Sequence, residues 1–299
     1  MEMNLRLLRY FVTVVDHGHF GKAAQSLYVS APALTKDVRR LEQILGLTLL
    51  NRDSHPIRPT SEGEAFLVEA RRVLDAAQRA VAVAHAQSRR HRHRLALGFV
   101  VTPLGGRSRQ LIEAFAAEVG PETLQLIELG LGDQLEAVAD GRVDASLAWG
   151  PVADARLHTE PVLSARRVLA VPVDHPLAQS SELSVAELPD LPHVRLAADL
   201  VSERWVRWWA CDPRPDGSPV RYGPPVRTIA EFLERAATGR EVAITSALLA
   251  EAFMPHDLAF VPIVDAPPSE VFLCVRRDDD APLLSVLRTV LKQSVDQPR

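Results

Sequence analysis

Cysteine is nearly absent from this sequence, and its scarcity argues against two kinds of scaffold. The 299 residues contain two cysteines, Cys211 and Cys274, which lie far apart and lack Cys-x-x-Cys spacing. That arrangement disfavours both a disulfide framework and a structural zinc site. We expect both to be ordinary reduced side chains, and the sequence indicates no metal and no other cofactor.

Long apolar runs are also missing. No uninterrupted apolar stretch approaches the roughly 20 residues that a membrane-spanning helix requires. The first fifteen residues, MEMNLRLLRYFVTVV, mix charges into an apolar helical period, and no small-residue cleavage site follows them. A signal peptide is therefore not expected. We expect no membrane partner and a cytoplasmic location.

The motifs of common enzyme classes are absent as well. Gly130-x-Gly132 lacks the third glycine and the acidic residue of a dinucleotide-binding fingerprint. There is no P-loop, no Gly-x-Ser-x-Gly and no His-Glu-x-x-His. Because nothing in the sequence indicates an activated nucleophile, we predict a protein that is not an enzyme.

Charge is present but unevenly distributed. The formal net charge is −4, yet residues 1–94 contain 15 Lys and Arg against 9 Asp and Glu, and the remainder contains 19 against 29. A basic first part on an acidic body indicates a polyanionic partner for the first part only. Solvated faces that merely differ in composition would give the same counts, so charge alone leaves both interpretations open.

Apolar residues spaced three and four apart predict three helices at the N-terminus, over about residues 5–17, 20–27 and 31–45. Ser30 can cap the third helix, and Pro32 is tolerated in its first turn. The expected buried stripe of the third helix is Leu34, Val38, Leu41 and Leu45. The outward-facing residues are then Thr35, Lys36, Arg39 and Arg40.

The second and third helices have the pattern of a helix-turn-helix, whose second helix can enter a DNA major groove about 12 Å wide. A solvated basic face on a small helical bundle is the alternative. Residues 47–59 favour the first interpretation, because a short apolar strand, a turn and a return suit a β-hairpin wing. Arg52 and Arg58 on that wing are expected near phosphates or the minor groove.

A long helix is predicted to follow for about thirty residues, capped by Thr60 or by a Ser61–Glu64 capping box. Its apolar seam consists of Phe66, Ala70, Val73, Ala77, Ala80 and Ala84. Small seam residues suit an antiparallel pairing between two copies of the chain, and an intrachain contact is the alternative. The helix ends in SRRHRHR, where His91 and His93 indicate a basic linker in preference to a metal site.

Residues 5–63, from LRLLRYFVTVVDHGHFGKAAQSLYVSAPALTKDVRRLEQILGLTLLNR to RPTSEG, closely resemble the N-terminal segment of LysR-type transcriptional regulators. The likeness rests on Phe-x-x-Ala-Ala, Pro-x-Leu, Leu-Glu-x-x-Leu-Gly and Leu-Leu-x-Arg taken together. It implies a winged helix-turn-helix that binds a double-stranded DNA operator, a long dimerising helix, and a periplasmic-binding-protein-like effector domain. It also implies a homodimer or a homotetramer.

The recognition helix departs from the family pattern. Ala31 stands where the family commonly has Gln, so it can read only a thymine methyl or DNA shape. Lys36 replaces a bidentate arginine with a point charge, and Asp37 would repel phosphate unless Arg39 or Arg40 neutralises it. The expected DNA-binding residues are Ser30, Ala31, Pro32, Thr35, Lys36, Arg39, Arg40, Arg52 and Arg58.

Strands and helices alternate over residues 95–149, which predicts βαβ units of a parallel sheet, and a second series of strands and helices starts at residue 166. The predicted strands are 95–99, 123–129, 143–149, 166–172, 241–245 and 271–276, and the helices are 106–119, 132–141, 228–239 and 282–294. Two α/β subdomains with two crossings resemble, more loosely, the family's effector domain, whose cleft holds a small molecule.

In open α/β sheets ligands bind beyond the carboxyl ends of strands and at helix N-termini. With the family likeness, this rule gives the expected effector-binding residues Thr102, Leu131, Ala197, Ala198, Thr228 and Thr245. For Thr102 and Thr228, simple helix capping is the alternative. Leu131 stands where relatives are often polar, so this wall of the cleft is expected to be apolar.

Three of the four tryptophans, Trp205, Trp208 and Trp209, would share one face of a helix, at spacings of three and four residues. They form either a packing or oligomer contact or an aromatic wall of the effector pocket. The neighbouring arginines Arg195, Arg204 and Arg207 suit an anionic ligand or are ordinary surface charges. The expected effector is accordingly an anionic or aromatic metabolite.

The sequence as a whole predicts an α/β protein with an N-terminal all-α winged helix-turn-helix and a two-subdomain effector domain. The predicted domains are 1–59 for the DNA-binding domain, 60–92 for the linker helix, 93–162 with 266–299 for effector subdomain I, and 163–265 for subdomain II. The predicted function is a LysR-type transcriptional regulator controlled by a small molecule. A free solute-binding protein and an architectural DNA-binding protein are the alternatives.

Overall fold

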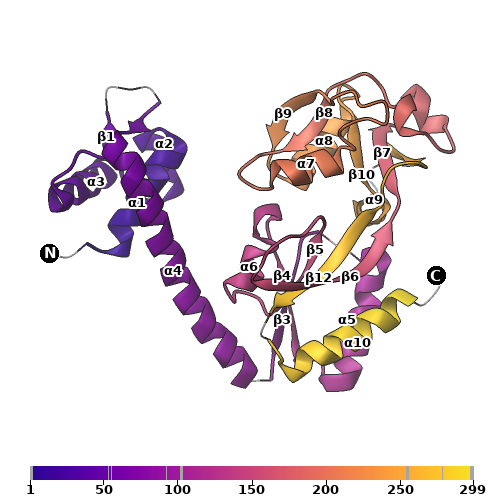
Figure 1. The fold of residues 1–299 in the computed structure, drawn as a ribbon, viewed down its shortest axis with the longest axis horizontal. Coiled ribbons are helices and arrows are strands. Elements are labelled where there is room, and N and C mark those ends of the chain that lie inside the picture. The colour runs from indigo at the N-terminus through magenta and orange to yellow at the C-terminus, as the bar shows by residue number, and fades with distance from the viewer. Residues whose placement is uncertain are drawn as a thin grey trace. The chain divides into compact units, whose positions relative to one another are not determined.

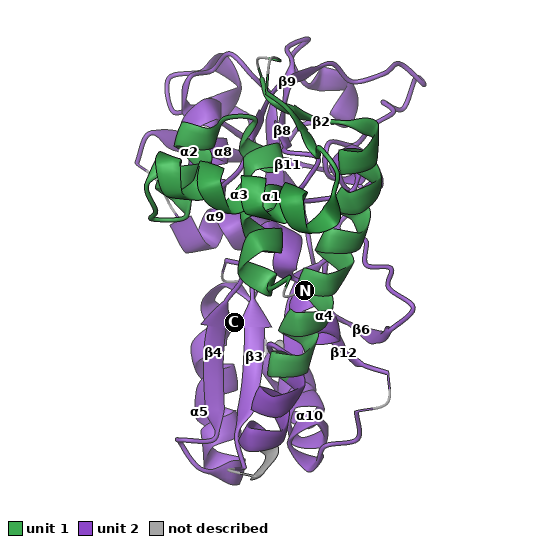
Figure 2. Ribbon diagram, turned by 90° about the vertical axis from the view of Figure 1, so that its left-hand side faces the viewer, with its two compact units in different colours: residues 1–82 green, residues 83–299 purple. Residues whose placement is uncertain are grey.

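The computed structural model describes residues 3–52, 54, 56–91, 93–101, 104–253, 256–277 and 279–296. Most of its helices and strands are labelled in Figure 1, and β2 and β11 are labelled in Figure 2. The chain divides into two compact units, residues 1–82 and 83–299, which Figure 2 colours separately. Within the described residues, no helix combines the length and the apolar character that a membrane crossing needs.

The first unit opens with three helices, α1 (Leu5–His17), α2 (Phe20–Ser26) and α3 (Ala31–Leu45), which confirms the predicted series. The Ser30 hydroxyl caps α3 by accepting from the Ala33 N–H at 3.4 Å, and Gly46 ends the helix with a φ of +68°. Their shared core contains Leu7, Leu8, Phe11, Val14, Ala23, Ala24, Leu34, Val38 and Leu41. Leu45, expected in the same stripe, is only partly buried.

A small wing follows α3. Strand β1 (Leu50–Asn51) pairs antiparallel with β2 (Arg58–Pro59), as the sequence predicted. The long helix α4 (Ser61–His91) then begins with Thr60 as its cap, because the Thr60 hydroxyl accepts from the Gly63 N–H at 3.0 Å. The alternative capping box does not form, since the Ser61 hydroxyl donates to the Glu62 carboxylate at 2.8 Å.

The apolar seam of α4 divides into two parts. Phe66 packs on Phe11 with ring centroids 5.7 Å apart, and Ala70 is 1% exposed, so the start of the seam completes the core of the first unit. Farther along, Val73 is 42% exposed, and Ala80 and Ala84 are exposed too. The intrachain contact therefore accounts only for the first turns of this seam.

The second unit contains two lobes, each with its own sheet. The first lobe is built on a five-stranded sheet with the order β4-β3-β5-β12-β6. Its strands are β3 (Leu95–Phe99), β4 (Leu124–Glu128), β5 (Ala145–Trp149), β6 (Leu157–Ala165) and β12 (Ser269–Arg276). Helices α5 (Ser108–Val119) and α10 (Pro282–Asp296) pack on each other, and the short α6 (Glu136–Ala139) precedes β5.

The second lobe has a three-stranded sheet, β10-β7-β11, and a separate pair, β8-β9. Its strands are β7 (Arg167–Pro172), β8 (His193–Leu196), β9 (Tyr222–Val226), β10 (Ala243–Ser246) and β11 (Leu258–Ile263). Its helices are α7 (Glu203–Trp209), α8 (Ile229–Ala237) and α9 (Ala247–Phe253). A buried cluster of Leu169, Val171, Leu183, Val242, Ile244, Val261 and Ile263 supports the three-stranded sheet.

The predicted parallel βαβ arrangement is confirmed for β3, β4 and β5, whereas the other strands of the two larger sheets pair antiparallel. Strand β3 runs parallel to β4 and β5, but β12 returns antiparallel to both of its neighbours, and the three-stranded sheet is wholly antiparallel. The first crossing between lobes lies at Arg166, later than the expected boundary after residue 162, because Leu163, Ser164 and Ala165 still pair with β12. The predicted helix over 132–141 is reduced to a 3-10 turn at Leu131–Asp133 and the single turn of α6.

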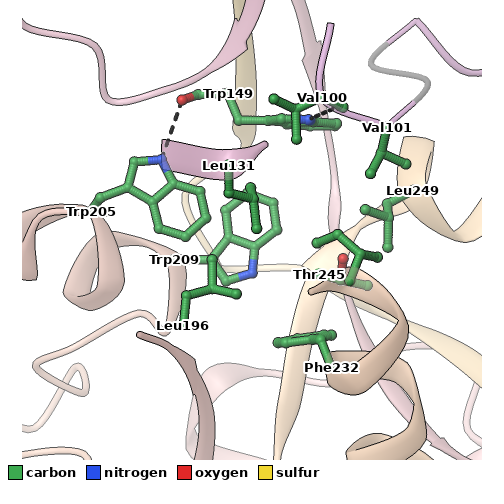
Figure 3. Close-up of a pocket in the computed structure, with 11 residues that line it drawn as sticks. Val100, Val101, Leu131, Trp149, Leu196, Trp205, Trp209, Phe232, Thr245 and Leu249 are labelled. Carbon is green, nitrogen blue, oxygen red and sulfur yellow. Dashed lines mark hydrogen bonds between the residues drawn. The ribbon is translucent and has the colours of Figure 1, made fainter. Parts of the chain in front are cut away.

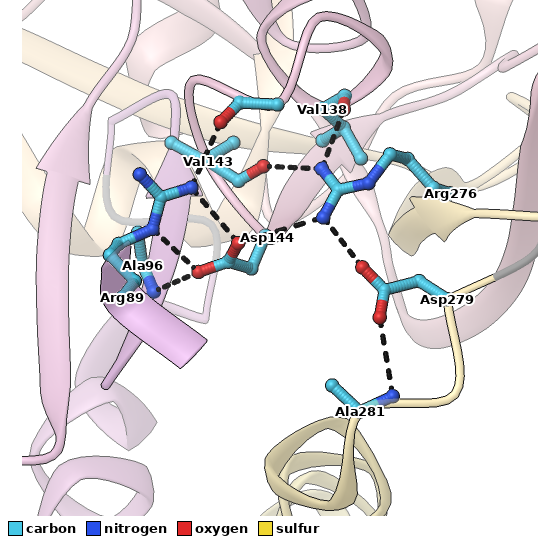
Figure 4. Close-up of polar contacts among 9 residues, drawn as sticks. Arg89, Ala96, Val138, Val143, Asp144, Arg276, Asp279 and Ala281 are labelled. Atoms are coloured by element: carbon cyan, nitrogen blue, oxygen red, sulfur yellow. Dashed lines mark hydrogen bonds and ion pairs between the residues drawn. The ribbon is translucent and has the colours of Figure 1, made fainter. Parts of the chain in front are cut away.

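The end of α4 is tied to the first lobe by a buried polar network (Figure 4). Arg89 donates to both carboxylate oxygens of Asp144, at 2.8 and 2.9 Å, and to the Gly141 carbonyl at 2.9 Å. Asp144 also accepts from the Ala96 N–H at 2.9 Å and lies 3.6 Å from the Arg276 guanidinium. The side chains of Arg89 and Asp144 are 13% and 8% exposed, so this ion pair is largely shielded from water.

Candidate nucleic-acid interface and ligand pocket

The outward face of α3 is cationic. Leu34, Val38 and Leu41 are fully buried on its inner side, and Lys36, Arg39 and Arg40 are exposed on the other. Thr35 is half-buried and its hydroxyl donates to the Ala31 carbonyl at 2.8 Å within the helix. Ala31 and Pro32 form the first turn, where Ala31 is half-buried and Pro32 exposed.

Asp37 interrupts this cationic face, and its neutralising partner is not the one expected. Neither Arg39 nor Arg40 reaches it. The Arg6 guanidinium on α1 lies 3.4 Å from the Asp37 carboxylate instead. Because Arg6 comes from another helix, both arginines of α3 keep their charges directed outward.

The two wing arginines differ in their surroundings. Arg58 is exposed on β2. Arg52 donates to Glu42 of α3 at 2.7 Å, and its guanidinium lies 5.5 Å from the Phe20 ring centroid. Glu42 also accepts from the Leu49 N–H at 2.9 Å. Arg52 is thus engaged in holding the wing to the helix-turn-helix, a role that its place in the sequence did not indicate.

An apolar pocket lies between the two lobes of the second unit (Figure 3). Its lining is Val100, Val101, Leu131, Trp149, Leu196, Trp205, Trp209, Ile229, Phe232, Thr245 and Leu249. The first four come from the first lobe and the other seven from the second. The remaining cavity is about 20 Å³, enough for about one water molecule. A larger ligand therefore requires the lobes or the lining side chains to move.

Tryptophans from both lobes meet at this pocket. The rings of Trp205 and Trp209 are stacked, with centroids 4.8 Å apart and an interplanar angle of 9°, and Trp149 meets Trp209 edge-on at 5.8 Å. The Trp205 indole N–H donates to the Trp149 carbonyl at 3.2 Å, across the lobe boundary. The tryptophans are thus both a packing contact and an aromatic wall, which unites two interpretations that the sequence left separate.

A buried cation lies behind this wall. Arg167 is fully buried; its Nε donates to the Pro267 carbonyl at 2.6 Å and its Nη1 to the Trp209 carbonyl at 2.9 Å. Its guanidinium carbon lies 4.3 Å from the Trp208 ring centroid, and burial lowers its pKa to about 10. Arg167 therefore joins the end of α7 to the second crossing between the lobes.

The structure separates the predicted effector-binding residues into three groups. Leu131 and Thr245 line the pocket. Ala197, Ala198 and Thr228 do not: Leu196 and Ile229, one residue away, occupy the lining instead, and the Thr228 hydroxyl caps α8 by accepting from the Glu231 N–H at 3.1 Å. Thr102 lies outside the described residues. Of the three arginines considered for an anionic ligand, Arg195, Arg204 and Arg207, none lines this pocket.

Several lining residues were missed by the sequence reasoning. Val100 follows β3, Trp149 ends β5, and Phe232 and Leu249 lie on helices α8 and α9. The end of a strand marks the first two as candidates. Phe232 and Leu249 carry no such signal, because an apolar residue on a helix face looks the same whether it faces a core or a pocket.

Two family models match the chain. The model described as "Bacterial regulatory helix-turn-helix protein, lysR family" matches residues 5–64, and the "LysR substrate binding domain" matches residues 88–296. The HTH-type transcriptional regulator BenM of Acinetobacter baylyi is 26% identical over an alignment of 305 residues, which covers 97% of this chain and 96% of BenM. AlsR of Bacillus subtilis is 29% identical over 197 residues, which cover 66% of this chain and 65% of AlsR.

Solved structures show the same architecture. Full-length BenM matches with a TM-score of 0.55 at 25% identity, over 97% of this chain and 96% of BenM. Full-length CbnR complexed with its target DNA has a TM-score of 0.55 at 24% identity, over 98% of this chain and 100% of CbnR, and supports the fold alone. The LysR substrate-binding model matches well over half of the residues of this chain. The chain therefore belongs to the LysR family and is a DNA-binding transcriptional regulator, not an enzyme.

Proposed function

We propose that this regulator reads an operator through the exposed face of α3 and responds to an uncharged aromatic effector in the pocket between the lobes. LysR regulators bind DNA operators and small-molecule effectors and form oligomers. The observation that carries the DNA-binding part is the division of α3 into a buried apolar face and an exposed face with Lys36, Arg39 and Arg40. A helix-turn-helix inserts such a face into the major groove.

The DNA contacts we propose have separate tasks. Lys36 and Arg39 lie on the groove-facing side of α3, and Arg58 on the wing is free to neutralise a phosphate. Ala31 and Pro32 supply only apolar contact or shape at the start of α3. Arg52 acts mainly through its ion pair with Glu42, which fixes the wing relative to α3.

The test of DNA binding is a selection from random duplexes with the full chain, followed by affinity measurements across a salt series. Lys36→Ala should weaken binding to all duplexes and reduce the salt slope by about one, since the loss of one positive charge at the DNA surface releases one counterion fewer on binding. Lys292→Ala, an exposed lysine on α10 of the other unit, is the matched control and should change neither. An unchanged slope for Lys36→Ala would contradict the assignment.

We infer further that α4 pairs two copies of the chain through the uncovered part of its seam. Val73, Ala80 and Ala84 are exposed apolar residues on a helix whose first turns are already packed. Small residues permit two helices to approach closely. Ala80→Glu should shift the chain toward monomer in light scattering, whereas the control Gln78→Glu, an exposed position on the same helix, should not. Equal masses for both variants would refute this pairing.

The chemical class of the effector follows from the described pocket lining. Trp149, Trp205, Trp209 and Phe232 provide aromatic walls, and no described lining residue is charged. The Thr245 hydroxyl has no hydrogen-bond partner among the described residues and is free to orient a ligand. Aromatic walls with one polar group favour a flat, uncharged, aromatic molecule over an anion. We also expect this regulator to act in the cytoplasm, because its DNA partner lies there.

All four tryptophans lie in or beside the pocket, so tryptophan fluorescence reports effector binding directly. We expect neutral aromatic compounds to quench or shift this fluorescence and to raise the thermal midpoint of the second unit. Their carboxylate analogues should bind more weakly, because no described lining residue carries a charge to neutralise them. Tighter binding of the carboxylates would overturn the proposed class.

In the mechanism we propose, the effector spreads a pocket that otherwise holds about one water. Spreading it breaks the hydrogen bond from the Trp205 indole to the Trp149 carbonyl and changes the angle between the lobes. Contacts between copies then shift, and with them the spacing and bend of the bound DNA.

A further inference from the structure

One tyrosine of the helix-turn-helix projects into solvent in a strained backbone conformation. Tyr28 lies in the turn between α2 and α3, and it is 96% exposed. Its φ of +54° places it in the left-handed region, which residues with a Cβ adopt rarely. The other tyrosines differ: Tyr10 packs against the Arg6 guanidinium, and the Tyr222 hydroxyl donates to Asp212 at 3.0 Å.

The turn holds Tyr28 outward by two backbone hydrogen bonds. The Val29 N–H donates to the Ala24 carbonyl at 3.0 Å, and the Tyr28 N–H donates to the Gln25 carbonyl at 3.2 Å. This is the hydrogen-bond pattern of a Schellman motif, whose left-handed position glycine usually occupies. Leu27 and Val29 pack against the core on either side. The Cα–Cβ bond of Tyr28 is consequently fixed in direction, toward solvent, at a position where glycine would be less strained.

The surroundings of this turn suit an anionic partner. From Phe20 to Lys36 the sequence contains two lysines and no acidic residue. Tyr28 precedes Ala31, the first residue of α3, by three positions. A recognition helix enters the groove with its N-terminal residues. The turn before it therefore lies at the rim of the groove, beside the sugar-phosphate backbone.

We propose that Tyr28 is a positioning residue for DNA recognition, whose hydroxyl donates a hydrogen bond to a phosphate oxygen at the edge of the groove that α3 enters. This rests on the proposed DNA-binding function. Tyrosine hydroxyls are among the groups that fix a protein's register on a duplex through phosphate contacts. Since the phenol carries no charge, it fixes the register without releasing a counterion.

The missing charge gives the contact a signature that separates it from the lysine contacts. Tyr28→Phe should weaken binding to the selected operator about tenfold, as expected when one hydrogen bond to a charged group is lost. The loss should be equal at every salt concentration, so the salt slope stays unchanged. Lys36→Ala, in contrast, should lower both the affinity and the slope.

The test uses the full chain with Tyr28→Phe, Tyr28→Gly and the control Tyr10→Phe, which removes a hydroxyl from the same unit. Affinities are measured by fluorescence anisotropy at several salt concentrations, and thermal midpoints by circular dichroism. Tyr28→Gly should bind more weakly while its midpoint rises by about 3 °C, because glycine relieves the strain at this position. Tyr10→Phe should bind as the wild type does.

The outcomes distinguish the role of Tyr28 from the DNA-binding function on which it rests. Normal operator binding by both Tyr28 variants, with Lys36→Ala still impaired, overturns the role of Tyr28 and leaves DNA binding intact. A lower thermal midpoint in Tyr28→Gly together with weak binding assigns Tyr28 to folding, and also overturns it. Failure of the wild type to select any duplex refutes the proposed function, and the role of Tyr28 with it.

Discussion

Removing the Asp144 carboxylate should unfold the second unit at a markedly lower temperature. Asp144 accepts two hydrogen bonds from Arg89 and one from the Ala96 N–H, and it lies 3.6 Å from the Arg276 guanidinium. Asp144→Ala leaves Arg89, which is 13% exposed, without its counter-charge and the Ala96 N–H without its acceptor. Asp144 is therefore the common partner of α4, β3 and β12.

The magnitude follows from this burial. Breaking a buried ion pair by removing one partner costs about 3–5 kcal/mol. For a unit of this size, each kcal/mol lowers the thermal midpoint by about 2–4 °C, so Asp144→Ala should lower it by roughly 6–12 °C at the lower end of that cost. Arg89→Ala should cost less, because Asp144 keeps the Ala96 N–H and Arg276 as partners.

Tryptophan fluorescence during heating is the suitable assay, since all four tryptophans lie in the second unit. The matched control is Arg109→Ala, which breaks an exposed pair with Glu113 whose side chains are 84% and 60% exposed. Exposed pairs of this kind contribute about 0.3–0.5 kcal/mol, so its midpoint should hardly move. A drop for Asp144→Ala no larger than that of the control would refute the reasoning that shielding from water makes the Arg89 pair strong.

Three further predictions concern single side chains. Thr60→Ala removes the cap of α4 and should destabilise the first unit by about 1 kcal/mol, measured by circular dichroism, and a stable variant would show that the hydrogen bond to Gly63 contributes nothing. His193 is buried beside Arg214, and burial lowers its pKa to about 3. Between pH 6.5 and 3 the unfolded chain binds the extra proton, so the stability of the second unit should fall by about 1.4 kcal/mol for each pH unit of acidification. His193→Gln should remove its share of that slope in urea unfolding, and an identical slope in the variant would contradict the assignment. Thr245→Val should raise the thermal midpoint, because a buried hydroxyl without a described hydrogen-bond partner is replaced by a methyl group. Neutral aromatic ligands should bind this variant more weakly. A lower midpoint would mean that the Thr245 hydroxyl already has a hydrogen-bond partner.

Much of the first unit was predictable because its signals are local. Ser30 and Gly46 bound α3 through caps that depend on neighbouring residues alone, and the spacing of Leu34, Val38 and Leu41 fixes the buried side of the helix. Once that side is known, Lys36 and Arg39 must face outward. The pairing of Arg6 with Asp37 was not predictable, because it joins side chains that only the packing of α1 on α3 brings together.

The lining of the ligand pocket, in contrast, was predicted only in part. Thr228 and Ala197 were each one residue away from the lining, where Ile229 and Leu196 lie. Leu196 ends strand β8, and neighbouring side chains along a strand point to opposite faces, so an error of one position selects the wrong face. Thr228 is instead the N-cap of α8, whose hydroxyl turns toward the Glu231 N–H. The sequence pattern locates the edge of the sheet but does not say which of two neighbours turns inward.

The amino-acid sequence by itself determined the helix-turn-helix, its cationic face, the long helix and the α/β character of the second unit. Each of these depends on periodicity and capping within a few residues. Only the tertiary structure decided that β12 returns antiparallel into the first sheet, that Arg89 reaches Asp144, and that tryptophans from both lobes close one pocket. These features join residues far apart in the chain, and which distant surfaces meet is set by the packing of the whole unit.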